Sequence, residues 1–130
     1  MRLSSKLLIE QLGTDYIDTK LKGFSYDHAS HLVQMRYGDV VNNENDKMIF
    51  FRNCFSVSIN TWLEGIKGKA PSNPGEMDFF LHGITIDDVE VSGVQLYKCS
   101  MKIPMMDCQI TCVTIELNCT NGARYLNQLV

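Results

Sequence analysis

One-by-one alternation of apolar and polar side chains is the feature that most constrains the fold of this chain. In Phe55–Asn60 every second residue is apolar, and Val33, Met35 and Tyr37 repeat the same period within Leu32–Tyr37. Successive side chains of a β-strand point to opposite faces, so this period is typical of strands with one buried face. The chain is therefore expected to build its core from strands.

Other segments extend this pattern. Ser4 or Ser5 is expected to cap a helix that runs to Leu12 and stops at Gly13. The segment Thr14–Gly23 is ambiguous and could form a second short helical turn. Further strands are expected at Met48–Arg52, Met77–Ile86 with a continuation to Val91, Gln95–Ile103 and Cys108–Asn118. About six to eight strands after one N-terminal helix predict a mainly β, α+β fold, either an antiparallel sandwich or a strongly bent sheet. We expect residues 1–130 to form a single domain.

Composition narrows the classes of function. The chain has 130 residues and a formal net charge of −3, so no overall attraction to nucleic acid is expected. No apolar run approaches the roughly 18 residues of a membrane span, and no glycine-rich turn joins a strand to a helix as in nucleotide-binding folds. We expect a cytoplasmic protein without a cofactor. Its five cysteines are expected to be reduced thiols, most of them buried in strands.

One cluster could carry chemistry. Asp27, His28 and His31 lie within five residues of each other, and imidazole and carboxylate groups serve as metal ligands and as general acids and bases. They could form a small metal site or a hydrolase-like site. The alternative is a hydrogen-bonded loop, because the two histidines are three residues apart rather than four.

A second group could bind a partner. Asp87, Asp88 and Glu90 form an acidic run, which could face a basic protein, bind a divalent cation, or form a solvated turn. Trp62 and Glu64 precede a loop at Gly65–Gly75. Trp62 could plug the end of the core or serve as a binding hot spot.

Four stretches together carry a family resemblance. They are Phe24–Leu32, Ile49–Cys54, Asn60–Gly65 and Cys112–Cys119. These stretches resemble small bacterial proteins of the polymorphic-toxin immunity type, in which an aromatic residue, a His/Asp pair and an alanine precede a strand-rich domain.

The resemblance implies a protein that acts by binding. It would hold one cognate toxin and block the toxin's active site without catalysing a reaction. The surface expected to do so includes Trp62, the Gly65–Gly75 loop and nearby acidic groups. Two alternatives stay open: a metal-binding protein or enzyme that uses Asp27, His28 and His31, and a structural subunit of a homo-oligomer.

Overall fold

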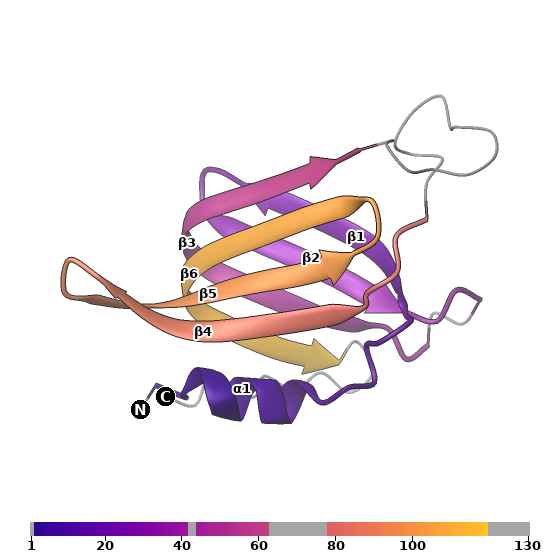
Figure 1. Cartoon of the computed structure of the whole chain (residues 1–130), viewed down its shortest axis with the longest axis horizontal. Helices are drawn as coiled ribbons and strands as arrows, with labels where there is room; N and C mark the ends of the chain where they lie inside the picture. Colours follow the sequence, from indigo (N-terminus) through magenta and orange to yellow (C-terminus); the bar gives the residue numbers. More distant parts are fainter. Residues whose placement is uncertain (1, 42–43, 63–77, 120–130) are drawn as a thin grey trace.

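A single bent antiparallel sheet forms the body of the protein (Figure 1). The computed structural model describes residues 2–41, 44–62 and 78–119. Within that part the strand order is β1-β2-β3-β6-β5-β4, and one helix packs beside the sheet. The elements are α1 (Ser5–Leu12), β1 (Lys20–Asp27), β2 (Leu32–Gly38), β3 (Lys47–Thr61), β4 (Gly83–Val91), β5 (Val94–Ile103) and β6 (Met106–Cys119). This confirms the mainly β, antiparallel prediction with an N-terminal helix; all six described strands belong to one sheet.

The helix begins and ends where the sequence predicts. The Ser4 hydroxyl accepts a hydrogen bond from the Leu7 N–H, and Gly13, with φ of 69°, donates its N–H to the Ile9 carbonyl. Glycine adopts this left-handed conformation without a steric penalty. Leu8 and Leu12 are buried on one side of α1. In the described residues no helix is long and apolar enough to cross a membrane.

The ambiguous segment Thr14–Gly23 forms a turn followed by a strand, and a helical turn does not extend to Gly23. A short turn follows Gly13, and β1 then begins at Lys20 and pairs along its length with β2. Gly23 lies within the strand, next to a register shift, and does not end a helix. The side chains of β1 are at most half-buried because β1 lies at one end of the sheet order. The alternation that marks the other strands is therefore weak here.

The two strands predicted at Met48–Arg52 and Phe55–Asn60 are one long strand, β3, with a bend between them. Asn53 has a φ of 56°, and the pairing with β6 shifts register between Cys54 and Ser56. β2 pairs with β3 only as far as Phe51. Beyond the bend β3 continues beside β6 alone, as the uppermost strand in Figure 1.

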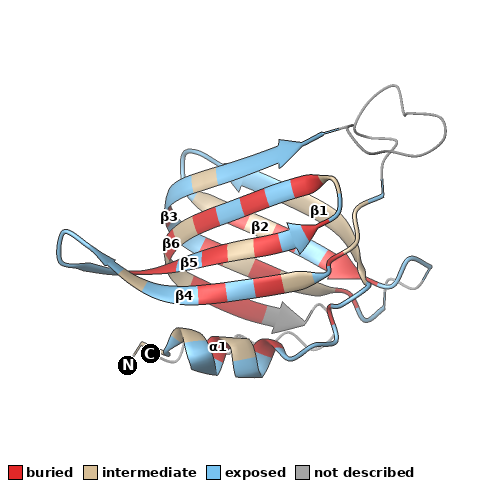
Figure 2. Cartoon of the chain, viewed as in Figure 1, coloured by how far each residue is buried: buried red, intermediate tan, exposed pale blue. Residues whose placement is uncertain are grey.

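The core lies on the inner side of the bent sheet (Figure 2). Val33, Met35 and Tyr37 are buried as predicted. In β6 the predicted alternation fails. Cys108, Ile110 and Cys112 are buried, but so are Ile115 and Leu117, which strict alternation over the expected strand Cys108–Asn118 would place on the opposite face. The buried positions of β6 therefore shift by one residue, from even-numbered to odd-numbered, where β6 passes the bend of β3.

The strand expected from Met77 begins only at Gly83, as β4. Tight turns separate β4, β5 and β6. Ser92–Gly93 joins β4 to β5, and Pro104–Met105 joins β5 to β6. Gly93 has a φ of 83°, which favours glycine at this turn. The Gly65–Gly75 loop lies outside the described residues.

A buried carboxylate ties the first three strands together. Asp46 is 0% exposed, and its oxygens lie 2.7 Å from Nζ of Lys22 and 2.6 Å from Nη2 of Arg36. Burial alone would raise the pKa of Asp46, but the hydrogen bonds and positive charges of Lys22 and Arg36 outweigh it and hold that pKa below its ordinary value of 3.8. Gly38 lies against this carboxylate, since a Cβ there would be 3.0 Å from Asp46 Cγ.

The substitution Gly38→Ala tests this packing. The added methyl group would push Asp46 away from Lys22 and Arg36, so we expect unfolding free energy to fall by about 2–3 kcal/mol. Gly23→Ala is the matched control in the neighbouring strand, because its Cβ would meet only Arg36 Cβ at 3.7 Å. Urea unfolding of both variants measures the difference; equal stabilities would contradict the account.

Candidate functional site

The bend of β3 forms one wall of an open hollow of about 570 Å³. Its other wall is the turn between β1 and β2. The lining residues are Tyr26, His28, His31, Asn53, Cys54, Phe55 and Val113. The rings of Tyr26 and His28 meet edge to face with centroids 6.2 Å apart, and those of His28 and His31 with centroids 5.5 Å apart. The hollow is therefore largely aromatic.

Asp27 holds the turn that carries these histidines. Its carboxylate accepts hydrogen bonds from the Ala29 N–H at 3.0 Å and the Ser30 hydroxyl at 2.9 Å. The Ser30 hydrogen bond, followed by that of Ala29, lowers the pKa of Asp27. The carboxylate thus caps a turn, which agrees with the alternative of a hydrogen-bonded loop. In the described residues no three His, Cys, Asp or Glu side chains are grouped so as to hold a metal ion.

Cys54 lines this hollow, but its thiol is hydrogen-bonded to the backbone. The thiol donates to the Phe51 carbonyl at 3.2 Å, and Cys112 is its direct partner across the β3–β6 ladder. The hydrogen bond with Cys54, together with burial, raises the pKa of Cys112; burial raises that of Cys108 to about 12. The Cys54 backbone N–H donates to the His31 carbonyl at 3.0 Å, but among the described residues no hydrogen bond joins the Cys54 thiol to the imidazole of His28 or His31. The hydrogen bond with Cys112 lowers the pKa of Cys54, but the thiol has no imidazole partner among the described residues, so the geometry is that of packed thiols.

An apolar ridge continues from the hollow along the outer half of β3. It consists of Phe55, Val57 and Ile59, which we call the β3 ridge; Trp62 follows directly after β3, where the alternation of the strand directs it to the opposite face from Ile59. Phe55 is 69% exposed, Ile59 43% and Trp62 39%, while Val57 is half-buried. Trp62 does not plug the core: it remains partly exposed, and its N–H donates to the Met105 carbonyl. Large side chains exposed side by side are uncommon on a monomer and mark contact surfaces.

Sequence reasoning missed the exposure of Phe55 and Ile59. The alternation in Phe55–Asn60 was correctly taken as a strand, and its apolar side as a buried face. The period gives the side to which a residue points, but not whether a neighbouring strand covers it. Beyond the bend no described strand lies on the second side of β3, so the apolar side chains stay partly exposed.

The acidic run lies within β4 and is not a turn. Asp87 points outward, directly opposite Lys98 of β5. Asp88 accepts a hydrogen bond from the Ser5 N–H and forms an ion pair with Arg2, each at 2.9 Å. Glu90 accepts a hydrogen bond from Gln95. The three carboxylates do not converge, and Asp88 attaches the start of α1 to the sheet. Glu64 lies outside the described residues.

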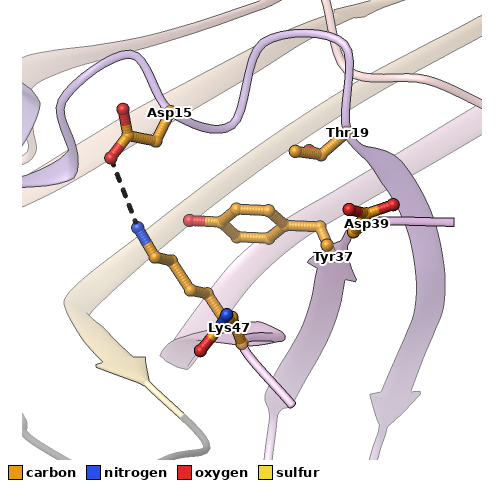
Figure 3. Close-up of a pocket in the computed structure, with 7 residues that line it drawn as sticks. Asp15, Thr19, Tyr37, Asp39 and Lys47 are labelled. Carbon is orange, nitrogen blue, oxygen red and sulfur yellow. Dashed lines mark ion pairs between the residues drawn. The ribbon is translucent and has the colours of Figure 1, made fainter. Parts of the chain in front are cut away.

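A smaller hollow of about 270 Å³ lies near the other end of β2 (Figure 3). Tyr37 and Thr19 face it, and Lys47 lies 3.9 Å from Asp15 across its mouth. Because these opposite charges lie close together, the hollow has little net charge to attract an ionic ligand.

Comparison with protein families tests the family resemblance. A family model described as Immunity protein PIM7 matches residues 4–119. The chain belongs to this immunity-protein family. The match spans the helix and all six described strands, and it confirms the resemblance to toxin-immunity proteins. No curated protein matches the chain. Immunity function implies binding to a cognate toxin protein.

In this immunity protein Asp88 and Asp87 should differ in their effects on stability. Asp88→Ala removes a backbone hydrogen bond and an ion pair at the start of α1, so we expect a loss of about 1 kcal/mol at pH 7. The hydrogen bond from Ser5 lowers the pKa of Asp88, so its contribution is complete above about pH 4 and disappears as the pH falls through the lower folded value.

Asp87→Ala is the control, because Asp87 is exposed and opposite Lys98. A change within about 0.5 kcal/mol is expected. Thermal unfolding of both variants at pH 7 and at pH 3 provides the comparison. A stability deficit of Asp88→Ala that persists undiminished in acid would contradict this role.

Proposed function

We propose that the chain is a cytoplasmic immunity protein that neutralises one cognate toxin by binding it, without catalysing a reaction. The observation that carries this proposal is the match of the immunity family over residues 4–119. The geometry of the described part is in keeping with it, because the prominent surface feature is apolar and the thiols are packed in the core.

The binding surface that we propose is the β3 ridge together with the aromatic hollow at the bend. Phe55 belongs to both, so the two features form one continuous patch. Aromatic side chains dominate the energetics of protein interfaces because they bury a large area with few rotatable bonds. A stable complex buries about 800 Å² on each partner, so the contact would extend beyond the patch onto polar neighbours.

Polar neighbours are available for such a rim. On the other face of the sheet from Val57 and Ile59, Gln109 and Thr111 of β6 lie opposite Ser58 and Ser56, within reach of a partner that passes around the edge of β3. Asp107 extends this row with a negative charge. Charges at a rim mainly speed association and select partners. With a net charge of −3, a basic toxin domain would be attracted weakly over long range. The acidic run plays a smaller part than its sequence suggested, since Asp88 is engaged with α1.

Co-expression tests this function directly. Cells that produce the toxin encoded beside the gene for this chain should survive when the chain is present and die with an empty vector. Purified chain should also bind a catalytically inactive form of that toxin domain with a 1:1 stoichiometry in calorimetry. Survival no better than with the vector, together with no heat of binding, would overturn the proposal.

The patch itself is tested by truncating its exposed side chains. Phe55→Ala is expected to weaken toxin binding about tenfold or more, because a buried aromatic contact at the centre of an interface contributes about 2 kcal/mol. Stability should change little, since the Phe55 side chain is 69% exposed in the free chain.

Val91→Ala is the matched control, because Val91 is 56% exposed at the far β4–β5 hairpin. Its affinity for the toxin domain should equal that of the unmodified chain. If Val91→Ala weakened binding and Phe55→Ala did not, the binding surface would lie at the other end of the sheet.

A further inference from the structure

The outer half of β3 has a free hydrogen-bonding edge. The Trp62 N–H donates to the Met105 carbonyl on the β6 side. Backbone groups of successive residues in a strand point to alternate sides, so the groups of Asn60, Ser58 and Ser56 also face β6. Those of Thr61, Ile59 and Val57 face the opposite side, where the structure places no strand among the described residues.

The other two strands that end the sheet are protected. Beside β1, the Leu21 N–H donates to the Phe79 carbonyl and the Leu81 N–H to the Thr19 carbonyl, so a connecting segment covers part of that edge. β4 carries three carboxylates, one of which holds the start of α1. Charged side chains and covering segments are the usual means of preventing further strand pairing.

In the part of the chain that the structure describes, the outer half of β3 has neither form of protection. Residues 53–62 contain no charged side chain and no proline. Moreover, Val57 is paired with Ile110 and Ile59 with Cys108, and both of these β6 residues are fully buried. The inner face of the sheet is thus apolar up to this edge. A strand added here would extend the ladder and cover Val57 and Ile59 in one step.

We propose that a segment of the cognate toxin adds to this edge as a further antiparallel or parallel strand, paired with Val57, Ile59 and Thr61 of β3. The segment would be extended and uncharged, with apolar side chains on the face that covers Val57 and Ile59. This inference rests on the proposed function, which supplies a protein partner. It specifies how that partner is held: by main-chain hydrogen bonds along β3, next to the aromatic hollow at the bend.

The toxin, rather than a second copy of the chain, is the occupant that the structure and the family support. The aromatic hollow adjoins the end of the free edge, because Phe55, two residues before Val57, lines the hollow. A partner that occupies both features must present an extended strand to the edge and a separate group of side chains to the hollow. Immunity function, in turn, requires a protein partner other than the chain itself.

A pair of substitutions at one position separates main-chain pairing from side-chain contact. Ile59→Ala and Ile59→Pro both remove the apolar side chain, but only proline also removes the outward N–H. We expect Ile59→Pro to bind the inactive toxin domain about ten- to a hundredfold more weakly than Ile59→Ala, because a hydrogen bond is lost and its partner carbonyl is left unsatisfied. Equal affinities would overturn the proposal.

Stability controls accompany this pair. Proline is tolerated in an edge strand where its missing N–H would face outward, so Ile59→Pro should remain folded. Ser58→Pro removes an N–H that faces β6 and should be clearly destabilised. If the two proline variants lost equal stability, the assigned direction of the backbone groups would be wrong, and the proposal with it.

Amide exchange of the unmodified chain gives an independent test that needs no variant. In the free chain the amides of Val57, Ile59 and Thr61 should exchange quickly, while those of Ser56, Ser58 and Asn60 are protected by β6. Binding of the inactive toxin domain should slow the first three by at least tenfold. Binding without this protection would overturn strand addition while the proposed function stands; a lack of any binding would overturn both.

Sedimentation of the free chain completes the design. A monomer at micromolar concentration is expected. A dimer in which Val57, Ile59 and Thr61 are already protected would assign the edge to a second copy and overturn the proposal.

Discussion

The bend in β3 is the constraint on which the rest of the structure depends. At this point Asn53 takes a left-handed conformation with φ of 56°, and the Cys54 N–H donates to the His31 carbonyl at 3.0 Å. Apart from glycine, asparagine and aspartate adopt this conformation more readily than most other residues. The hydrogen bond from Cys54, which runs from β3 to the residue just before β2, follows the last β2–β3 pair, Val33 with Phe51, and beyond it the two strands separate.

Three features follow from that separation. The turn that carries His28 and His31 lies against the bend and encloses the aromatic hollow. The outer half of β3 becomes an edge, which leaves Phe55 and Ile59 exposed. β6 follows β3 through the bend, and its inward-facing set changes by one residue. A single local conformation therefore determines the hollow, the ridge and the packing of the longest strand pair.

Much of the fold could be predicted from the sequence, because strong alternation and clear turn residues mark most of its elements. Val33, Met35 and Tyr37 are buried as their period indicates, and Gly13 and Gly93 adopt the positive φ for which glycine is suited. β1 was missed because its pairing with β2, rather than a periodic buried face, makes it a strand. The bend was missed because Asn53 and Cys54 look like a gap between two strands until the pairing with β6 is known.

The candidate site was less accessible from the sequence. Trp62 was among the residues expected to bind, and its partial exposure keeps that prediction open. Asp87, Asp88 and Glu90 are adjacent in sequence, but the pleat of β4 sends Asp87 to one face and Asp88 to the other, towards Ser5. Phe55 and Ile59 could not be identified, because their exposure depends on the absence of a neighbour in the sheet, and neighbours depend on topology.

The unprotected edge of β3 also bears on how a family of such proteins could distinguish between toxins. Main-chain pairing is almost independent of sequence, since every residue except proline offers the same donor and acceptor. Strand addition at Val57–Thr61 would therefore supply affinity without much selectivity. Selectivity requires side chains that fit one partner and clash with others. On this chain they lie at the bend, where Tyr26, His28 and Phe55 surround the hollow. Substitutions there could change the toxin that is recognised without altering the ladder or the core, because these side chains are exposed and lie outside the buried cluster.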